Sequence, residues 1–292
     1  MAKSRTLGHL AALFTIIVWG TTFVCTKVLL KSFTPCEILI FRFVLGFLAL
    51  CLMSHHRLKG VTRKQEMLFA AAGLTGVCLY YFLENTALVY TMASNVGVIT
   101  ATAALFSALF AYLFTDEKGL TPRFLLGFVL AISGIALISF NGLELQLNPL
   151  GDFLALGSSL TWGIYSVMIK KINKYGYSTL QSTKRIFAWG MFFLLFTIPG
   201  SGSSWDMARL LDVQNLLGLL FLGLIASALC FLTWNYAVKE IGAISASVYL
   251  YLNTVVTIIA SFLVLGEPIT AKSALGTLLV LSGLVISEQR HK

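Results

Sequence analysis

Apolar residues run along almost the whole chain in ten stretches of about 20, and short polar or charged segments separate them. A helix of that length is long enough to cross the hydrocarbon core of a bilayer. The approximate ranges of the ten predicted spans are 8–30, 36–54, 66–90, 94–115, 123–140, 150–170, 178–199, 213–237, 243–265 and 271–287. The pattern therefore predicts an all-α polytopic membrane protein.

The ten spans fall into two similar sets of five. Two constant offsets, of 143 and 150 residues, align the sets and give these pairs: Trp19-Gly20 with Trp162-Gly163, Arg42 with Arg185, and Asn85 with Asn235. Because each set has an odd number of spans, the second copy must enter the membrane from the opposite side. We therefore predict two inverted five-helix repeats, residues 1–142 and 149–292, which together form one membrane unit.

Composition agrees with this architecture, since 58% of the 292 residues are hydrophobic and 11% are charged. The net charge of +9 lies mainly in the N-terminus, in every second loop and in the C-terminus. By the positive-inside rule, both termini are predicted to be cytoplasmic, in the inner (plasma) membrane of the cell. The basic excess is thus interpreted as an orientation signal and a contact with anionic lipid. No nucleic-acid partner is expected, because aromatic residues do not alternate with the basic ones.

Charged side chains inside the predicted spans are candidates for function, because a charge in the bilayer is costly unless it meets water or a partner. They are Lys27, Glu37, Arg42, Glu84, Lys184 and Arg185. Glu84 lies well inside the third span and shares a helix face with Tyr80. Two interpretations remain open for Glu84: a site for a substrate amine or a proton, or a salt bridge to Arg42, Lys184 or Arg185 that fixes helix packing.

Arg42 and Arg185 are equivalent under the repeat, and each lies early in the second span of its half. An arginine so near the membrane surface can extend its side chain to the interface, which is the interpretation we favour for both. The guanidinium group also binds carboxylates in a bidentate manner. Arg42 and Arg185 are therefore the candidates for holding a substrate carboxylate, if there is one.

Polar and aromatic residues form stripes on several spans. Such stripes can line a cavity, although small hydroxyl side chains also join helices in membranes, and aromatic rings also gather at the interface. Trp19 and Trp162 lie near the middle of their spans, where the interface explanation is weaker. The predicted substrate-binding residues are Trp19, Tyr80, Glu84, Asn85, Trp162, Trp234, Asn235, Tyr249 and Asn253.

The fifth and tenth spans are almost purely apolar and carry glycines seven residues apart. The pairs are Gly127 with Gly134 and Gly276 with Gly283. Small residues at this spacing make a groove for close helix packing. These two helices are predicted to be scaffold or the surface of a homodimer, so the chain is expected to be a monomer or a homodimer through them.

These features resemble the ten-helix EamA branch of the drug/metabolite transporter (DMT) superfamily. The resemblance covers nearly the whole chain and rests on the duplication, on the two Trp-Gly pairs, and on the acidic segments Thr-Asp-Glu117 and Leu-Gly-Glu267-Pro268. It implies an inner-membrane transporter whose central cavity is formed by the first four helices of each half. Glu117 lacks the preceding glycine and the following proline, and both glutamates are interpreted as residues of the membrane boundary.

The sequence therefore predicts a secondary-active transporter that exports a small metabolite, either an amino acid or a related amine or aromatic compound, by alternating access. Uptake or exchange of a nucleotide-like compound, a sugar or a cationic drug is the alternative. Proton coupling would depend on Glu84. An intramembrane enzyme is disfavoured, because the four histidines, His9, His55, His56 and His291, lie at the ends of spans, in a loop or at the C-terminus, and no catalytic residue, metal or cofactor is expected. A channel is disfavoured because no repeated pore loop is visible.

Overall fold

The computed structural model describes residues 2–56, 58–90, 93–115, 121–139, 149–265 and 271–288. Every regular element in these ranges is a helix, which confirms the predicted all-α class. Five helical stretches are long and apolar enough to cross a membrane by length and composition: Ser4–Leu29, Pro35–Met53, Arg63–Tyr90, Val213–Ile241 and Ala243–Val264.

The α-helices and π-helical segments follow one another in the same order in both halves, and the second half adds two 3₁₀ turns. The first half contains α1 (Ala2–Leu29), α2 (Pro35–Met53), α3 (Arg63–Gly73), the π-helical segment η1 (Leu74–Leu79), α4 (Tyr80–Tyr90), α5 (Ala93–Thr100), α6 (Ala103–Phe114) and α7 (Pro122–Ser139). The second half contains α8 (Pro149–Asn173), α9 (Thr179–Leu194), the 3₁₀ turns η2 (Leu195–Thr197) and η3 (Met207–Leu211), α10 (Val213–Leu220), the π-helical segment η4 (Phe221–Leu229), α11 (Cys230–Ile241), α12 (Ala243–Ser247), α13 (Leu250–Leu265) and α14 (Ala271–Glu288).

Two predicted spans are interrupted, which corrects the prediction of one continuous helix in each. The span predicted over 94–115 is divided into α5 and α6, and the span predicted over 243–265 into α12 and α13. At the first interruption the Thr102 hydroxyl donates to the Ile99 carbonyl at 2.6 Å. At the second, the Ser247 hydroxyl donates to the Ile244 carbonyl at 2.8 Å. Such side-chain bonds compete with the helical ladder, and apolar periodicity does not reveal them.

The third span of each half contains a π-helical segment at the corresponding place, η1 in one and η4 in the other. A π-helix widens the turn and rotates the residues that follow it, and it often lies at functional sites. In this chain the residues that follow are Tyr80 and Tyr81 after η1, and Cys230 and Phe231 after η4. The irregular turns therefore set the orientation of α4 and α11.

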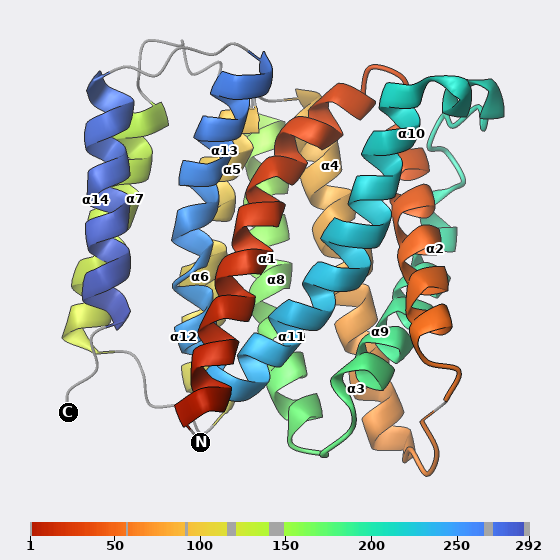
Figure 1. Ribbon diagram of the computed structural model, residues 1–292, viewed down its shortest axis with the longest axis horizontal. Coiled ribbons are helices and arrows are strands. Elements are labelled where there is room, and N and C mark those ends of the chain that lie inside the picture. Colours follow the sequence, from red (N-terminus) through yellow and green to blue (C-terminus); the bar gives the residue numbers. More distant parts are fainter. Residues whose placement is uncertain are drawn as a thin grey trace.

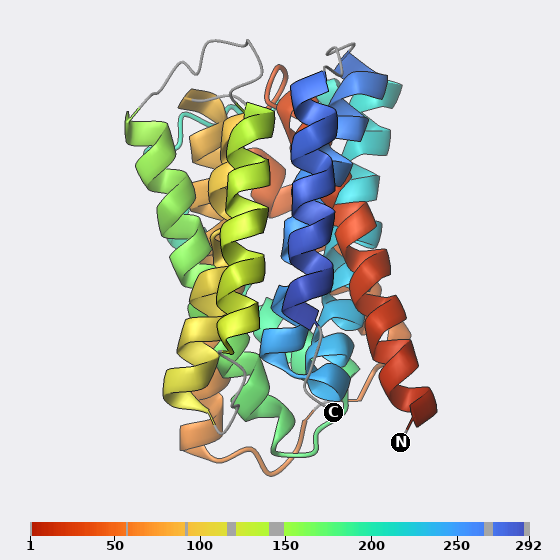
Figure 2. The same cartoon turned by 90° about the vertical axis from the view of Figure 1, so that its left-hand side faces the viewer.

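The two halves interlock rather than pack as separate bodies. α1 lies against α11 and α13 of the second half, while α8 lies against α4 and α6 of the first. α1 and α8 run in opposite directions, as Figures 1 and 2 show, and α1 begins at the side of the bundle where α14 ends. The space between the halves is therefore enclosed by helices of both.

α7 and α14 pack along each other at one edge of the bundle (Figures 1 and 2). A Cβ atom on Gly283 would lie 2.5 Å from the Gly127 carbonyl oxygen, which is closer than real atoms approach. The small residues thus bring these two helices together within one chain. A homodimer through their outer faces stays a prediction.

Candidate functional site

A small cavity lies between the two halves. Its volume is about 20 Å³, which leaves room for about one water molecule. The lining residues come from five of the predicted spans: Trp19, Thr22, Phe23, Tyr80, Tyr81, Glu84, Thr100, Ala103, Trp162, Leu250 and Asn253. Both interrupted helices contribute, since Thr100 and Ala103 flank one break and Leu250 follows the other. The cavity is therefore built where the helices are least regular.

Aromatic rings form one wall of the cavity. The ring centres of Trp19 and Trp162 are 5.1 Å apart, and those of Tyr80 and Trp162 are 4.8 Å apart. Trp234 lies behind this wall, 5.3 Å from Trp19. The Trp19 indole nitrogen donates to the Ala226 carbonyl at 2.9 Å, whereas the indole nitrogens of Trp162 and Trp234 are buried without a partner in the described chain. The wall therefore contains one hydrogen-bond donor without a partner in the described chain, the Trp162 indole nitrogen, and Trp234 holds a second behind it.

Glu84 contributes a carboxylate to the cavity. The residue is 3% exposed, and the Tyr80 hydroxyl is within hydrogen-bonding reach of its carboxylate. Within the described ranges Glu84 forms no ion pair. Its charge is therefore available to a bound molecule.

None of the cations named in the salt-bridge interpretation forms an ion pair with Glu84 in the described part of the chain. Lys184 donates to the Ser54 and His56 carbonyls at 2.7 Å each. Arg185 pairs with Glu66 at 2.9 Å, and its side chain is 42% exposed. Arg42 forms no ion pair with a described residue. The salt-bridge interpretation of Glu84 is wrong for the described part of the chain.

Arg42 is fully buried, so the expectation that its side chain extends to the membrane interface is wrong. Its Nε donates to the Ser227 hydroxyl at 2.6 Å, and its guanidinium carbon lies 4.1 Å from the centre of the Tyr81 ring. Arg42 is buried and Arg185 is partly exposed because their neighbours differ. η4 packs on α2 and holds Ser227 beside Arg42, whereas Arg185 lies at the end of the bundle beside Glu66.

Asn85 and Asn235 are equivalent in the repeat but not in their contacts. The Asn235 side chain accepts a 2.8 Å bond from the Tyr165 hydroxyl and donates a 2.9 Å bond to Thr183. Asn85 is equally buried, and neither atom of its amide has a partner among the described residues. Asn235 is thus a packing residue in this conformation, while Asn85 retains unused hydrogen-bonding capacity.

Two predicted site residues of the ninth span, Tyr249 and Asn253, lie in different surroundings. Asn253 lines the cavity, and its amide oxygen has no partner in the described chain. Tyr249 is not in the lining, and its hydroxyl contacts the His9 ring nitrogen at 2.9 Å. Tyr249 belongs to the turn between α12 and α13, whereas Asn253 lies in α13. An uninterrupted helix would have kept both on one stripe.

Six lining residues were not among the predicted site residues: Thr22, Phe23, Tyr81, Thr100, Ala103 and Leu250. Three of these could have been found from the sequence. Thr22 and Phe23 share a helix face with Trp19, and Tyr81 shares one with Asn85. The remaining three depend on the helix interruptions, for which periodicity gives no sign.

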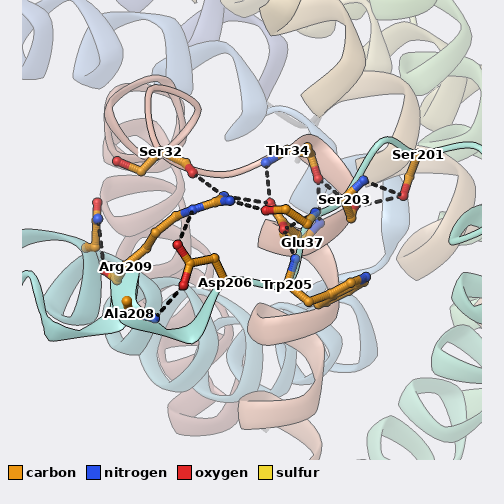
Figure 3. A network of polar contacts seen from close by, with 11 residues as sticks. Ser32, Thr34, Glu37, Ser201, Ser203, Trp205, Asp206, Ala208 and Arg209 are labelled. Carbon is orange, nitrogen blue, oxygen red and sulfur yellow. Dashed lines mark hydrogen bonds and ion pairs between the residues drawn. The ribbon is translucent and has the colours of Figure 1, made fainter.

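Glu37 belongs to a different place, at the end of the bundle where α2 begins (Figure 3). Its carboxylate accepts from the backbone nitrogens of Thr34 at 2.8 Å, of Trp205 at 2.8 Å and of Ser204 at 3.1 Å. Arg209 pairs with it at 3.4 Å. Glu37 therefore caps α2 and fastens the segment before α10 to it. It is a structural charge and not part of the cavity.

Other chemistry is sparse in the described part of the chain. The five cysteines are free, and no three acidic, histidine or cysteine side chains gather into a metal site there. Glu117 and Glu267, which were interpreted as boundary residues, lie outside the described residues.

Comparison with known proteins places the chain among transporters. The model of the EamA-like transporter family matches it twice, at residues 6–140 and 149–288. An uncharacterized transporter of Archaeoglobus fulgidus is 29% identical over 97% of this chain and 98% of its own length. A protein of Streptantibioticus cattleyicolor named "Probable terminal-alkyne amino-acid exporter" is 26% identical over 96% of this chain and 93% of its own length. A solved structure with 18% identity superposes with a TM-score of 0.77, covers 98% of this chain and 96% of its own, and supports the fold.

Proposed function

The chain belongs to the EamA-like transporter family of membrane proteins, and from that premise we propose that it is a secondary-active exporter of an amino acid or a related amine. The substrate site of this proposal is the cavity between the halves. One observation carries it: Glu84 lies in that cavity, buried and without a cationic partner in the described chain. A buried carboxylate of this kind recognises an amine or carries a proton.

The other groups around the cavity suit the same class of substrate. Trp19, Tyr80 and Trp162 present ring faces and edges, which attract cations as well as apolar groups. The Trp162 indole nitrogen and the Asn253 amide oxygen are a donor and an acceptor without partners in the described chain. The amine, the polar head and the apolar part of such a substrate would each meet a complementary group in the cavity. The name of the Streptantibioticus cattleyicolor relative points to the same class of compound.

The proposed mechanism is alternating access about the axis that relates the halves. A cavity with room for about one water molecule is too small for an amino acid, so the substrate requires the halves to move apart on one side. The interrupted helices α5/α6 and α12/α13 and the segments η1 and η4 are the places where such movement costs least, because their hydrogen-bond ladders are already irregular.

The test is transport in proteoliposomes against a panel of amino acids and their amines. We expect concentration-dependent transport of a subset of the panel, with competition among its members. Transport of none of them, by protein that is folded and inserted, would contradict the proposal. Loading the same vesicles with sugars and nucleotides tests the alternative substrate classes.

Proton coupling is a separate part of the proposal and depends on Glu84. We expect an imposed pH gradient to drive accumulation of the substrate against its own gradient. Equal rates with and without the gradient would indicate a facilitator that is not coupled to protons.

The proposed location is the inner membrane, with both termini cytoplasmic. Protease treatment or thiol labelling of the two ends in sealed vesicles checks this orientation.

A further inference from the structure

Arg42 is the least satisfied charged side chain in the described part of the chain. It is 0% exposed, its Nε donates to the Ser227 hydroxyl at 2.6 Å, and the Tyr81 hydroxyl is within reach of its guanidinium group. Both terminal amino groups lack a hydrogen-bond partner among the described residues. A guanidinium that is buried in this way normally meets a carboxylate or several carbonyls, because the energetic cost of an unpaired buried cation is high.

The free amino groups of Arg42 are arranged to bind an anion. Because Ser227 occupies Nε, the guanidinium is held at one edge while the two terminal groups remain together as a fork. A fork of two N–H donors is the geometry that a carboxylate accepts with both oxygens. No carboxylate of the described chain takes that place, so the site has capacity for one from outside.

The Tyr81 ring separates this fork from the cavity. The guanidinium carbon lies 4.1 Å from the ring centre, and Tyr81 itself lines the cavity. The ring is in contact with Tyr80, at 4.7 Å between centres, and with Phe43, at 5.2 Å. A rotation of one aromatic side chain would therefore open the fork to the cavity. Tyr81 is the second residue after η1, where the helix is irregular.

Glu84 lies about one helical turn after Tyr81, on the same side of α4. It is three residues after Tyr81 and lines the same cavity, and Arg42 is close enough for the two charges to attract each other without forming an ion pair. A fixed cation and a fixed anion thus flank one small space. Their natural complement is a molecule with one carboxylate and one ammonium group on neighbouring atoms.

We propose that the terminal amino groups of Arg42 bind the carboxylate of the substrate once the Tyr81 ring moves aside, while Glu84 binds its ammonium group. The inference deepens the proposed function and rests on it, because it restricts the substrates to zwitterionic amino acids. It also distinguishes the repeat-related arginines, since Arg185 already pairs with Glu66, is 42% exposed and does not line the cavity. Decarboxylated amines and amides are excluded as good substrates.

The test compares each amino acid of the transport panel with its own amide, which keeps the ammonium group and the side chain but lacks the carboxylate charge. Binding is followed by quenching of the intrinsic tryptophan fluorescence, and transport by uptake into proteoliposomes. For the wild type we expect the acid to bind at least about 10-fold more tightly than the amide, the scale of a charged hydrogen bond. This comparison needs no variant.

Arg42→Lys keeps the charge but removes the fork, and we expect it to bring the acid-to-amide affinity ratio close to one by weakening the acid alone. Ser227→Ala keeps Arg42 and removes its anchor, so a several-fold fall in the same ratio is expected even if Arg42→Lys does not fold. Arg185→Lys is the matched control and should leave the ratio unchanged.

The outcomes separate the two proposals. Equal affinity of the wild type for acids and amides, or equal weakening of both by Arg42→Lys, overturns the carboxylate site and leaves the transporter proposal in place. Binding of neither acids nor amides overturns both. Selective loss of the acid in Arg42→Lys, with the amide unchanged, supports the inference.

Discussion

The indole rings of Trp19 and Trp162 pack edge to face, with centres 5.1 Å apart and an interplanar angle of 84°. The two residues are equivalent under the internal repeat, at an offset of 143. Equivalent residues that touch each other lie at the axis that relates the two copies. Both also line the cavity, so the proposed substrate site lies on the axis about which the halves would move.

Trp162→Ala is expected to weaken substrate binding about tenfold, because an aromatic wall that packs against an amine or apolar group is lost. Trp162→Phe retains a ring and should lose less. Binding by fluorescence and uptake in proteoliposomes measure the effect, normalised to the amount of folded protein. Trp205→Ala, at the end of the bundle, is the matched control. Equal transport by Trp162→Ala and the wild type would remove Trp162 from the site.

Glu84→Gln is expected to lower the affinity for substrates with an ammonium group by about 10-fold to 100-fold, the scale of a lost charged hydrogen bond. It should also abolish any acceleration by a pH gradient, since glutamine does not carry a proton. Uptake with and without an imposed gradient measures both effects. Glu66→Gln removes a carboxylate outside the cavity and should leave the pH dependence unchanged. A gradient that still drives the Glu84→Gln protein would place coupling elsewhere.

Glu37→Ala is expected to lower the free energy of unfolding by about 2–4 kcal/mol, because the backbone N–H groups of Thr34, Ser204 and Trp205 lose their charged acceptor. The measurement is unfolding in detergent, by heat or by denaturant. Asp206→Asn is the control, because its side chain is 55% exposed and pairs with Arg209 within the same short segment. An unfolding midpoint equal to that of the wild type would contradict the structural role of Glu37.

The periodicity of the sequence predicts the helices and the duplication well, because both depend on residues that repeat. It predicts five of the eleven lining residues of the cavity, since Trp19 and Glu84 are conspicuous by type in an apolar span. It gives no sign of the turn between α12 and α13, which sends Tyr249 towards His9. It also gives the wrong environment for Arg42, at the membrane interface, because the burial of Arg42 depends on a neighbour, Ser227, that is distant in sequence.

Gly73→Ala is expected to destabilise the protein by about 1–3 kcal/mol, the cost of overpacking. A Cβ atom there would lie 2.6 Å from the Gly190 nitrogen and 2.7 Å from the Ile186 carbonyl oxygen, and backbone atoms cannot give way. The two glycines set the close approach of α3 and α9. Gly157→Ala is the control, because its nearest neighbour is a leucine methyl at 3.4 Å. It should be neutral or slightly stabilising in a helix.

Asn85 and Asn235 allow the same substitution to be made at two equivalent positions with opposite expected results. Asn235→Leu breaks the bonds to Tyr165 and Thr183 and leaves their hydroxyls buried, so we expect a loss of about 2–4 kcal/mol in stability. Asn85→Leu removes an amide that has no partner in the described chain. Replacing an unsatisfied buried polar group by an apolar one of similar size should be neutral or stabilising.

The functional effect of Asn85→Leu decides what the unused amide is for. If Asn85 binds substrate when the cavity opens, the variant will unfold at the same temperature as the wild type or higher and yet transport more slowly. Thermal unfolding and proteoliposome uptake, measured on one preparation, give both values. A stable variant with unchanged transport would remove Asn85 from the substrate site, and a destabilised one would show that its amide is satisfied in the folded protein.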